Sequence, residues 1–305
     1  MTPFQRRRMI KFRNALPVGP LRFFIFSARI GYCSFFLLPA QLLDREPMSI
    51  VAIIPARYGS TRLPGKPLAM IGDKPMIQHV YENAAKARAL DSVIVATDDR
   101  RVEAAVRGFG GTVVMTSRRH RSGSDRLAEV ARKLRADWLV NVQGDLPFIA
   151  SETISRAVRP LRRDRSIPMG TVCSPIYDEK EWRNPNIVKV IKDAKGFAIY
   201  FSRAIIPYPR NSLAQARARE KRVWGLRHLG LYVYRREFLL KFAGLRPTEL
   251  EQTESLEQLR ALYYGYRIMV ADVDERSVEV DTPADLYRAQ RYLKGLKGSH
   301  GRSEN

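Results

Sequence analysis

The sequence predicts an α/β fold, in which a mainly parallel sheet is flanked by helices and an α+β insertion occupies the second half. Short apolar runs alternate with helix-like stretches between residues 48 and 168. These runs are apolar on both faces, which is typical of parallel strands covered by helices on two sides. After about residue 168 the apolar segments lengthen and follow one another at hairpin-like spacing, which predicts the insertion.

The expected elements of the first half are four strand–helix pairs. The pairs are SIVAIIPA with PMIQHVYENAAKARAL, SVIVATD with DRRVEAAVRGFG, TVVMT with SDRLAEVARKL, and WLVNVQGD with SETISRAVRPL. Sheets of this kind bind ligands at the carboxyl ends of their strands. Three polar clusters stand at those ends: the loop after the first strand, ATDD at 96–99 and QGD at 143–145.

The second half is expected to add longer strands and two helices. The expected strands are MGTVCSPI, NIVKVIKD, GFAIYFSRAIIPY, LGLYVYR and, later, YRIMVADV. One helix is expected over TESLEQLRALYYG, and a last helix that packs back is expected to start at Pro283, because proline suits the first helical position.

The ends of the chain differ from its middle in composition. Residues 1–47 begin with a basic stretch and continue with an apolar run, as a signal peptide or membrane anchor does. Arg22 and Arg29 interrupt the run, however, so that it falls short of the ~20 residues that span a membrane. We interpret residues 1–47 as a disordered leader or as sequence upstream of a true start at Met48; an interfacial amphipathic segment is the alternative. The domain is expected to end at residue 293, with a disordered tail over 294–305.

The composition points to an anionic partner and excludes several kinds of site. The formal net charge is +22, which suggests nucleotides, nucleic acid or a membrane surface, although a run such as RPLRRDR at 159–165 also suits a solvated basic surface. Two cysteines exclude a disulfide framework and fit a reducing cytoplasm. The histidines are dispersed and no HExxH or CxxC is present, which argues against a tightly held zinc ion.

The loop IIPARYGSTRLPGKP at 53–67 has the chemistry of a phosphate cradle. It carries Arg57, Arg62 and Lys66 without any acidic residue. Gly59 and Gly65 permit positive φ and close backbone approach, so that backbone N–H groups can join these cations around a polyphosphate. The loop matches neither GxxxxGK[ST] nor GxGxxG, and a generic anion or RNA contact is the alternative.

Two distant aspartates suit a divalent cation. Asp145 stands where the strand WLVNVQGD ends, and Asp281 precedes a helix that opens with Thr-Pro. Magnesium on a nucleotide is held by one or two carboxylates together with phosphate oxygens. The alternatives are a turn or helix-capping role for Asp145 and a capping role for Asp281.

Seven motifs in order then identify a family resemblance over about residues 48–293. They are IIPARYGSTRLPGKPL, SGSDRLAEV, NVQGDLP, YFSRAIIPY, RHLGLYVYRREFL, ESLEQLRALYYG and VDTPADL. Together they resemble the 3-deoxy-manno-octulosonate (Kdo) cytidylyltransferases. The resemblance implies a glycosyltransferase-A-like, Rossmann-like fold, a cytoplasmic homodimer and Mg²⁺. It also implies the reaction of CTP with Kdo to give CMP-Kdo and pyrophosphate, which supplies lipopolysaccharide synthesis.

The resemblance also assigns roles to parts of the chain. It implies a nucleotide-binding half at 48–168, a sugar-binding and dimer-forming part at 169–272, and a returning metal-site segment and helix at 273–293. It places at the CTP phosphates Arg57, Ser60, Arg62 and Lys66. It places at cytosine and ribose Ser122, Gly123 and Arg126. The nucleotide and metal motif holds Gln143 and Asp145, and the second metal carboxylate is Asp281. The sugar-acid wall is Arg203, His228, Glu257 and Gln258. Catalysis is assigned to Arg57, Arg62, Lys66 and Asp145.

One position departs from the family motif QGDEP. Leu146 replaces the glutamate, and a related branch that uses 8-amino-8-deoxy-Kdo also has a neutral residue there. The family resemblance predicts Kdo as the substrate. The departure at Leu146 leaves 8-amino-Kdo as an alternative, and another sugar acid, such as a sialic acid, is a further one. A basic nucleic-acid-binding protein is the alternative from a different class, although no RNP, KH or zinc-finger pattern appears.

Overall fold

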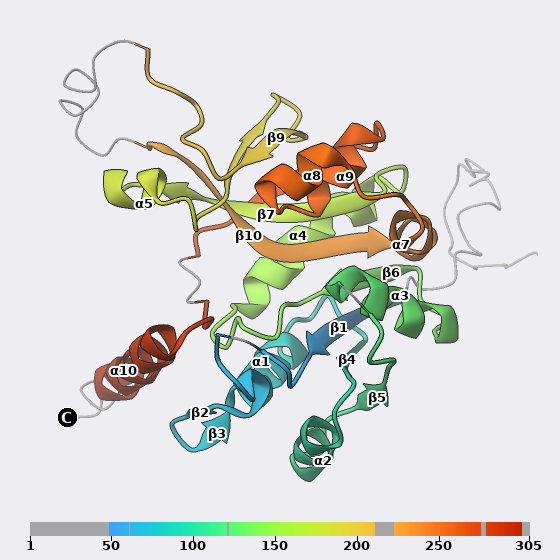
Figure 1. Ribbon diagram of the computed structural model, residues 1–305, viewed down its shortest axis with the longest axis vertical. Helices are drawn as coiled ribbons and strands as arrows, with labels where there is room; N and C mark the ends of the chain where they lie inside the picture. The colour runs from blue at the N-terminus through green and yellow to red at the C-terminus, as the bar shows by residue number, and fades with distance from the viewer. Residues whose placement is uncertain (1–48, 61, 121, 211–222, 276–278, 301–305) are drawn as a thin grey trace, which may run out of the picture. The chain divides into compact units, whose positions relative to one another are not determined.

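The computed structural model describes residues 49–300 except 61, 121, 211–222 and 276–278 (Figure 1). Residues 46–305 form one compact unit. The expected leader at 1–47 lies outside the described residues, as do residues 301–305 of the expected tail. Within the described residues, no helix is long and apolar enough to cross a bilayer.

A mixed, mainly parallel sheet runs through the described residues in the order β11-β7-β10-β6-β1-β4-β5. Its parallel part is β1 (Ile50–Ala56), β4 (Ser92–Thr97), β5 (Val113–Met115) and β6 (Trp138–Asn141). The long strand β10 (Gly225–Arg235) runs antiparallel to both β6 and β7 (Met169–Ile176). Beyond β7, β11 (Ile268–Asp272) is again parallel. The predicted α/β class with a mainly parallel sheet is therefore confirmed.

The insertion forms a hairpin on the second half of the sheet. Strands β8 (Lys189–Lys192) and β9 (Ala198–Ser202) pair antiparallel, and β8 also pairs with β10. The short helix α5 (Glu179–Arg183) precedes them. This hairpin carries Arg203 immediately after β9, and so fixes where one predicted sugar-binding residue stands.

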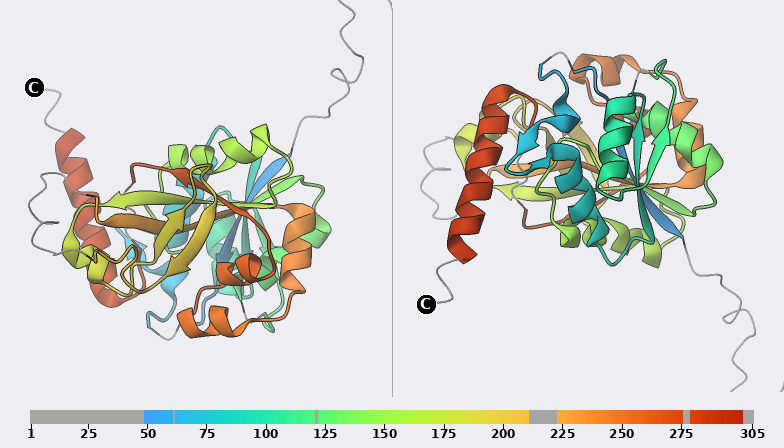
Figure 2. Two further views of the ribbon diagram at one scale, coloured as in Figure 1. Left: turned by 90° about the horizontal axis from the view of Figure 1, so that it is seen from above. Right: turned by 90° about the horizontal axis from the view of Figure 1, so that it is seen from below.

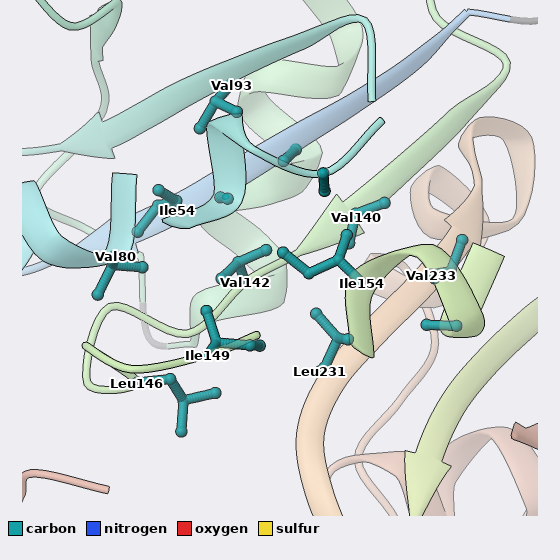
Figure 3. Packing of buried hydrophobic residues seen from close by; sticks show 14 of the residues in the cluster. Ile54, Val80, Val93, Val140, Val142, Leu146, Ile149, Ile154, Leu231 and Val233 are labelled. Atoms are coloured by element: carbon teal, nitrogen blue, oxygen red, sulfur yellow. The ribbon is translucent and has the colours of Figure 1, made fainter. Parts of the chain in front are cut away.

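Helices cover both faces of the sheet, because alternate residues of its strands are apolar on both sides (Figure 2). On one face, Ala52 and Ile54 of β1 pack with α1 (Met76–Ala85), α2 (Arg100–Gly108) and α4 (Ser151–Arg163). Figure 3 shows part of this core, including Ile54, Val80 and Ile154. On the other face, Val51 and Ile53 pack with α3 (Gly123–Lys133), α7 (Arg236–Ala243) and α9 (Gln258–Tyr263).

The single helix expected over TESLEQLRALYYG is wrong, since two short helices occupy this region. α8 (Glu249–Glu254) starts one turn earlier, where Thr248 and Glu251 form a capping box. It stops at Ser255, which adopts a left-handed conformation with φ of 51°. α9 then begins at Gln258. Because of this break, Glu257 and Gln258 stand at the N-terminus of a helix rather than on the side of a continuous one.

The last helix packs back on the first half, as expected, but runs further than expected. α10 (Pro283–His300) places Ala289 in a small core with Leu63, Ile71 and Met76, next to the hairpin of β2 (Met70–Ile71) and β3 (Lys74–Pro75). The helix passes residue 293, so residues 294–300 are helical rather than part of a disordered tail. No proline interrupts the backbone ladder in that stretch.

Candidate active site

The basic loop, the QGD segment and the segment before Asp281 meet at the carboxyl edge of the parallel strands. β1 and β6 are neighbours, so the loop after β1 and the segment after β6 leave the sheet side by side. Gly144 lies so close to β1 that a Cβ atom there would stand 2.8 Å from the carbonyl oxygen of Pro55. The backbone N–H of Val280 donates to the carbonyl of Asp145 at 3.0 Å. Segments more than a hundred residues apart in the chain are therefore joined at one place.

The basic loop folds back on itself before it enters the short helix η2 (Lys66–Leu68). Gly65 has φ of 66°, in the left-handed region, and its N–H donates to the carbonyl of Tyr58 at 3.2 Å. Gly59, which could also accommodate a positive φ, does not adopt one. The turn at Gly65 aims the next residue, Lys66, into the site.

Lys66 binds both predicted metal carboxylates. Its Nζ donates to Oδ2 of Asp145 at 2.7 Å and to Oδ1 of Asp281 at 2.8 Å. Arg62, which is largely exposed, lies 3.1 Å from the other oxygen of Asp281. Burial disfavours the charge on Lys66, but the two carboxylates outweigh it and raise the pKa of its ammonium.

Neither aspartate is used as a helix cap. α10 is capped by Thr282 and Asp285, since Oδ2 of Asp285 accepts from the N–H of Thr282 at 2.9 Å and from that of Asp281 at 3.1 Å. The N-cap of α4 is Ala150 rather than Asp145. The capping alternatives are thus not what the structure shows, and both carboxylates are turned toward the basic loop.

This donor set fits a hard divalent cation. Two carboxylates already converge on one positive charge, and oxygen ligands are what Mg²⁺ prefers. Among the described residues, no group of three or more His, Cys, Asp or Glu side chains is placed to hold a metal. A cation held by Asp145 and Asp281 would therefore complete its coordination with water and substrate oxygens.

Glu279 is an acidic neighbour that the sequence reasoning missed. Although the residue as a whole is exposed, desolvation of its carboxyl and repulsion by Asp145 and Asp281 raise its pKa to about 7. The signal was present in the pattern Glu279-Val280-Asp281, because residues two apart in an extended segment point to the same side.

The remaining residues predicted at the nucleotide, Arg57, Ser60 and Gln143, differ in burial and in hydrogen bonding. Arg57 is exposed and makes no hydrogen bond or ion pair with another described residue. Ser60 is half-buried, and its hydroxyl accepts from the N–H of Leu63 at 3.3 Å. Gln143 is also half-buried and lies beside Gly230 of β10. These three residues keep their predicted roles as predictions.

The predicted cytosine and ribose segment forms the N-terminus of α3. Ser122 caps the helix in a capping box with Asp125, and Gly123 is its first residue. Arg126 is fully buried, where it pairs with Asp98 at 2.8 Å and bonds the hydroxyl of Thr116. Arg126 is thus engaged inside the fold, and its predicted contact with cytosine or ribose stays a prediction. Asp98, from the ATDD cluster, is a partner that the sequence reasoning did not select.

The predicted sugar wall comes from three elements. Glu257 accepts from the hydroxyl of Ser124 at 2.6 Å, which joins it to the nucleotide segment, and burial raises its pKa. Gln258 is buried, and its Nε2 has no hydrogen-bond partner among the described residues. An unpartnered buried donor is costly in a protein, so this amide is a candidate ligand contact.

His228 has the environment of a core residue. It is 8% exposed, and its Nε2 lies 2.9 Å from Oγ1 of Thr171. That hydroxyl donates to the carbonyl of Leu231 at 2.7 Å, so we assign the histidine as the donor to Oγ1. Burial lowers the pKa of His228 to about 3. Its predicted contact with a sugar hydroxyl stays a prediction.

Leu146 does not face the site. Its side chain is 1% exposed and belongs to the core that contains Val142 and Ile149 (Figure 3). The residue that replaces the glutamate of the family motif is therefore a core residue, because its apolar side chain is buried with its neighbours. An effect of this residue on the choice of sugar would have to be indirect.

The basic run at 159–165 lies apart from these motifs. It borders a wide cavity of about 590 Å³ between α4 and the segment that follows α1, which is lined by Arg88, Arg159 and Arg162 among others. None of the predicted site residues lines that cavity. Its exposed arginines fit the solvated basic surface given above as the alternative.

Comparisons with known proteins show the family of the chain. A family model described as "Cytidylyltransferase" matches residues 51–268. The 3-deoxy-manno-octulosonate cytidylyltransferase of Syntrophotalea carbinolica is 54% identical over 250 residues, which cover 82% of this chain and 100% of the relative. The protein of the same name from Geobacter sulfurreducens is 51% identical, over 81% of this chain and 100% of its own length.

Solved structures give the same result. A CMP:2-keto-3-deoxy-manno-octonic acid synthetase in complex with CTP aligns with a TM-score of 0.75 and 44% identity, over 81% of this chain and 99% of that one. A 4-diphosphocytidyl-2C-methyl-D-erythritol synthase from Anaerococcus prevotii aligns with a TM-score of 0.55 at 13% identity, over 81% of this chain and 99% of that chain, which shows a shared fold alone.

Proposed function

Because this chain belongs to the cytidylyltransferase family, among the 3-deoxy-manno-octulosonate cytidylyltransferases, we propose that it transfers CMP from CTP to Kdo and releases pyrophosphate. The observation that carries the proposal is the cluster of Lys66, Asp145 and Asp281 at the carboxyl ends of the parallel strands. Phosphate-binding cations and metal-binding carboxylates are needed together at a reacting nucleotide.

The basic loop would hold the triphosphate of CTP. Lys66 and Arg62 pair with carboxylates in the free protein, and phosphate oxygens can take the place of those carboxylates as charged acceptors. Arg57 is exposed and available to join them. These cations would stabilise the negative charge that develops on the leaving pyrophosphate.

Asp145 and Asp281 would hold Mg²⁺. Bound there, the ion supplies Lewis acidity at the α-phosphate and favours ionisation of the attacking hydroxyl. The protein's own contribution is position: Gly144 brings Asp145 against β1, and the Val280–Asp145 backbone bond fixes Asp281 beside it. The anomeric hydroxyl of Kdo would attack the α-phosphorus in line with the departing pyrophosphate.

Arg203 supports a sugar acid as the acceptor. Its Nε donates to the carbonyl of Glu254 at 2.7 Å and its NH1 to that of Pro185 at 3.1 Å. Both acceptors are neutral, and no carboxylate among the described residues forms an ion pair with Arg203. A guanidinium held in this way keeps N–H donors for a carboxylate of the substrate, which Kdo carries.

The proposal extends to the oligomeric state, the compartment and the biosynthetic role of the enzyme. We propose a homodimer in the cytoplasm that supplies CMP-Kdo to lipopolysaccharide synthesis. Family membership favours this enzyme over the nucleic-acid-binding alternative. Kdo is favoured over 8-amino-Kdo and sialic acids by the names of the relatives.

The test is pyrophosphate release by the purified full chain with CTP and Mg²⁺. Kdo, 8-amino-Kdo and N-acetylneuraminate are compared as acceptors, with EDTA-treated enzyme as the metal control. The proposal expects turnover with Kdo that EDTA abolishes and Mg²⁺ restores. Absence of turnover with all three acceptors would refute it, and a preference for another acceptor would correct the substrate.

A further inference from the structure

Four hydrogen bonds hold Arg203, and the residues that make them have no assigned role. Its backbone N–H donates to Oε2 of Glu254 at 2.9 Å, and its carbonyl accepts from Nζ of Lys189 at 2.6 Å. Its guanidinium donates to the carbonyls of Glu254 and Pro185, as described above. Arg203 is thus fixed at both its backbone and its half-buried side chain.

Lys189 holds the carbonyl of Arg203 from inside the fold. It has no solvent exposure, and its ammonium donates to the carbonyls of Asn184 at 3.1 Å, Ile187 at 2.7 Å and Arg203 at 2.6 Å. These bonds use every proton of the ammonium. They bind the 184–187 loop, which supplies the Pro185 carbonyl, to the end of β9. A buried ammonium is expensive unless its hydrogen bonds are complete, and removal of Lys189 would leave three carbonyls without this donor.

Glu254 connects Arg203 to the rest of the predicted sugar wall. Oε1 accepts from the hydroxyl of Ser202 at 2.5 Å, while Oε2 accepts from the N–H of Arg203. Glu254 is also the last residue of α8, and the left-handed turn at Ser255 follows it directly. That turn leads to Glu257 and Gln258 at the start of α9. One carboxylate thus fixes the spacing between two separate parts of the wall.

We propose that Lys189 and Glu254 are positioning residues for the sugar-acid substrate, which act by holding the guanidinium of Arg203 at a fixed distance from Glu257 and Gln258. Neither residue needs to touch the substrate. The inference rests on the proposed function, because it assigns to Arg203 the carboxylate of the acceptor. It places the determinant of sugar-acid affinity in the β8–β9 hairpin and the α8–α9 turn, away from the nucleotide loop.

The proposal predicts a loss confined to one substrate. In Glu254→Gln the KM for Kdo is expected to rise about tenfold, while the KM for CTP stays within about twofold, because a misplaced arginine loses a charge-assisted bond. Lys189→Met is expected to show the same split. The matched controls are Glu249→Gln, an exposed acid on the same helix, and Lys195→Met, an exposed lysine in the same hairpin; both should behave as wild type.

A double-mutant cycle separates positioning from a general structural role. Arg203→Lys should raise the KM for Kdo by itself, and Glu254→Gln should add less than about twofold in that background, because residues that act through one another are not additive. Should Lys189→Met fail to fold, Glu254→Gln and the cycle still decide the matter.

The outcomes for the two proposals are distinct. Wild-type turnover, measured first with Kdo, 8-amino-Kdo and N-acetylneuraminate, tests the proposed function, and its absence with all three acceptors would overturn both proposals. With wild-type turnover present, an unchanged KM for Kdo in Glu254→Gln would overturn the positioning role. So would equal rises in both KM values, or additive effects in the cycle.

Discussion

Nζ of Lys66 lies 2.7 Å from Oδ2 of Asp145, although the two residues are 79 positions apart in the chain. The same ammonium reaches Asp281 at 2.8 Å. In the free protein, Lys66 therefore neutralises the carboxylates that are proposed to hold Mg²⁺. A nucleotide that draws Lys66 to its phosphates would expose those carboxylates to the metal.

The first prediction follows from this competition. Lys66→Gln should bind Mn²⁺ at least about tenfold more tightly than wild type in the absence of CTP, because one positive charge at contact distance is removed. Electron paramagnetic resonance of free Mn²⁺ measures the affinity. Lys74→Gln is the matched control, since Lys74 pairs with Glu82 outside the cluster. Equal Mn²⁺ affinities in Lys66→Gln and wild type would show that Lys66 does not compete with the metal.

The second prediction separates the metal role of Asp281 from helix capping. Asp281→Asn should lower kcat by about a hundredfold or more, because a ligand of the proposed Mg²⁺ is lost. Asp285→Asn should instead cost about 1 kcal/mol of unfolding free energy, because the α10 cap is weakened. Turnover and urea denaturation are measured on both variants. Near-normal turnover in Asp281→Asn would disprove the metal assignment.

The third prediction concerns the buried Leu146. Leu146→Glu should destabilise the protein by about 2–4 kcal/mol, because a carboxyl group would enter an apolar core without a partner. Leu146→Met, which conserves volume, should cost less than about 1.5 kcal/mol. Thermal and urea unfolding give both values. A glutamate tolerated at full stability would mean that the segment can turn this side chain into the site.

The fourth prediction is a pH dependence of stability from His228. The folded protein keeps His228 neutral down to about pH 3, whereas an unfolded histidine binds a proton below about pH 6.5. The unfolded state therefore binds more protons between these values, and stability falls as the pH falls, by at most ~1.4 kcal/mol per pH unit. Urea unfolding from pH 8 to pH 4 measures this slope. His228→Asn should reduce it, with pH 8 as the reference; an unchanged slope would contradict the assignment.

Much of the fold could be predicted from the sequence because its signals are local. The run SIVAIIPA predicted β1, which spans Ile50–Ala56, since apolar residues on both sides of a strand need helices on both faces. The Thr-Pro pair predicted the start of α10 at Pro283. The break at Ser255 was not predictable, because a single serine in the left-handed conformation carries no sequence signal and is imposed by the packing around it.

The sequence by itself determined which chemistry is available: a basic loop without acids, two aspartates at element ends, and ordered motifs that identify the family. Only the tertiary structure decided how these groups are used. In the tertiary structure the backbone N–H of Val280 donates to the carbonyl of Asp145, and Asp285 rather than Asp281 caps α10. The side chain of Leu146 is buried in the core. The tertiary structure also revealed Glu279 and the hold of Lys189 and Glu254 on Arg203. The reason is physical: propensity and periodicity act over a few residues, whereas contacts between distant segments depend on how the whole sheet is ordered.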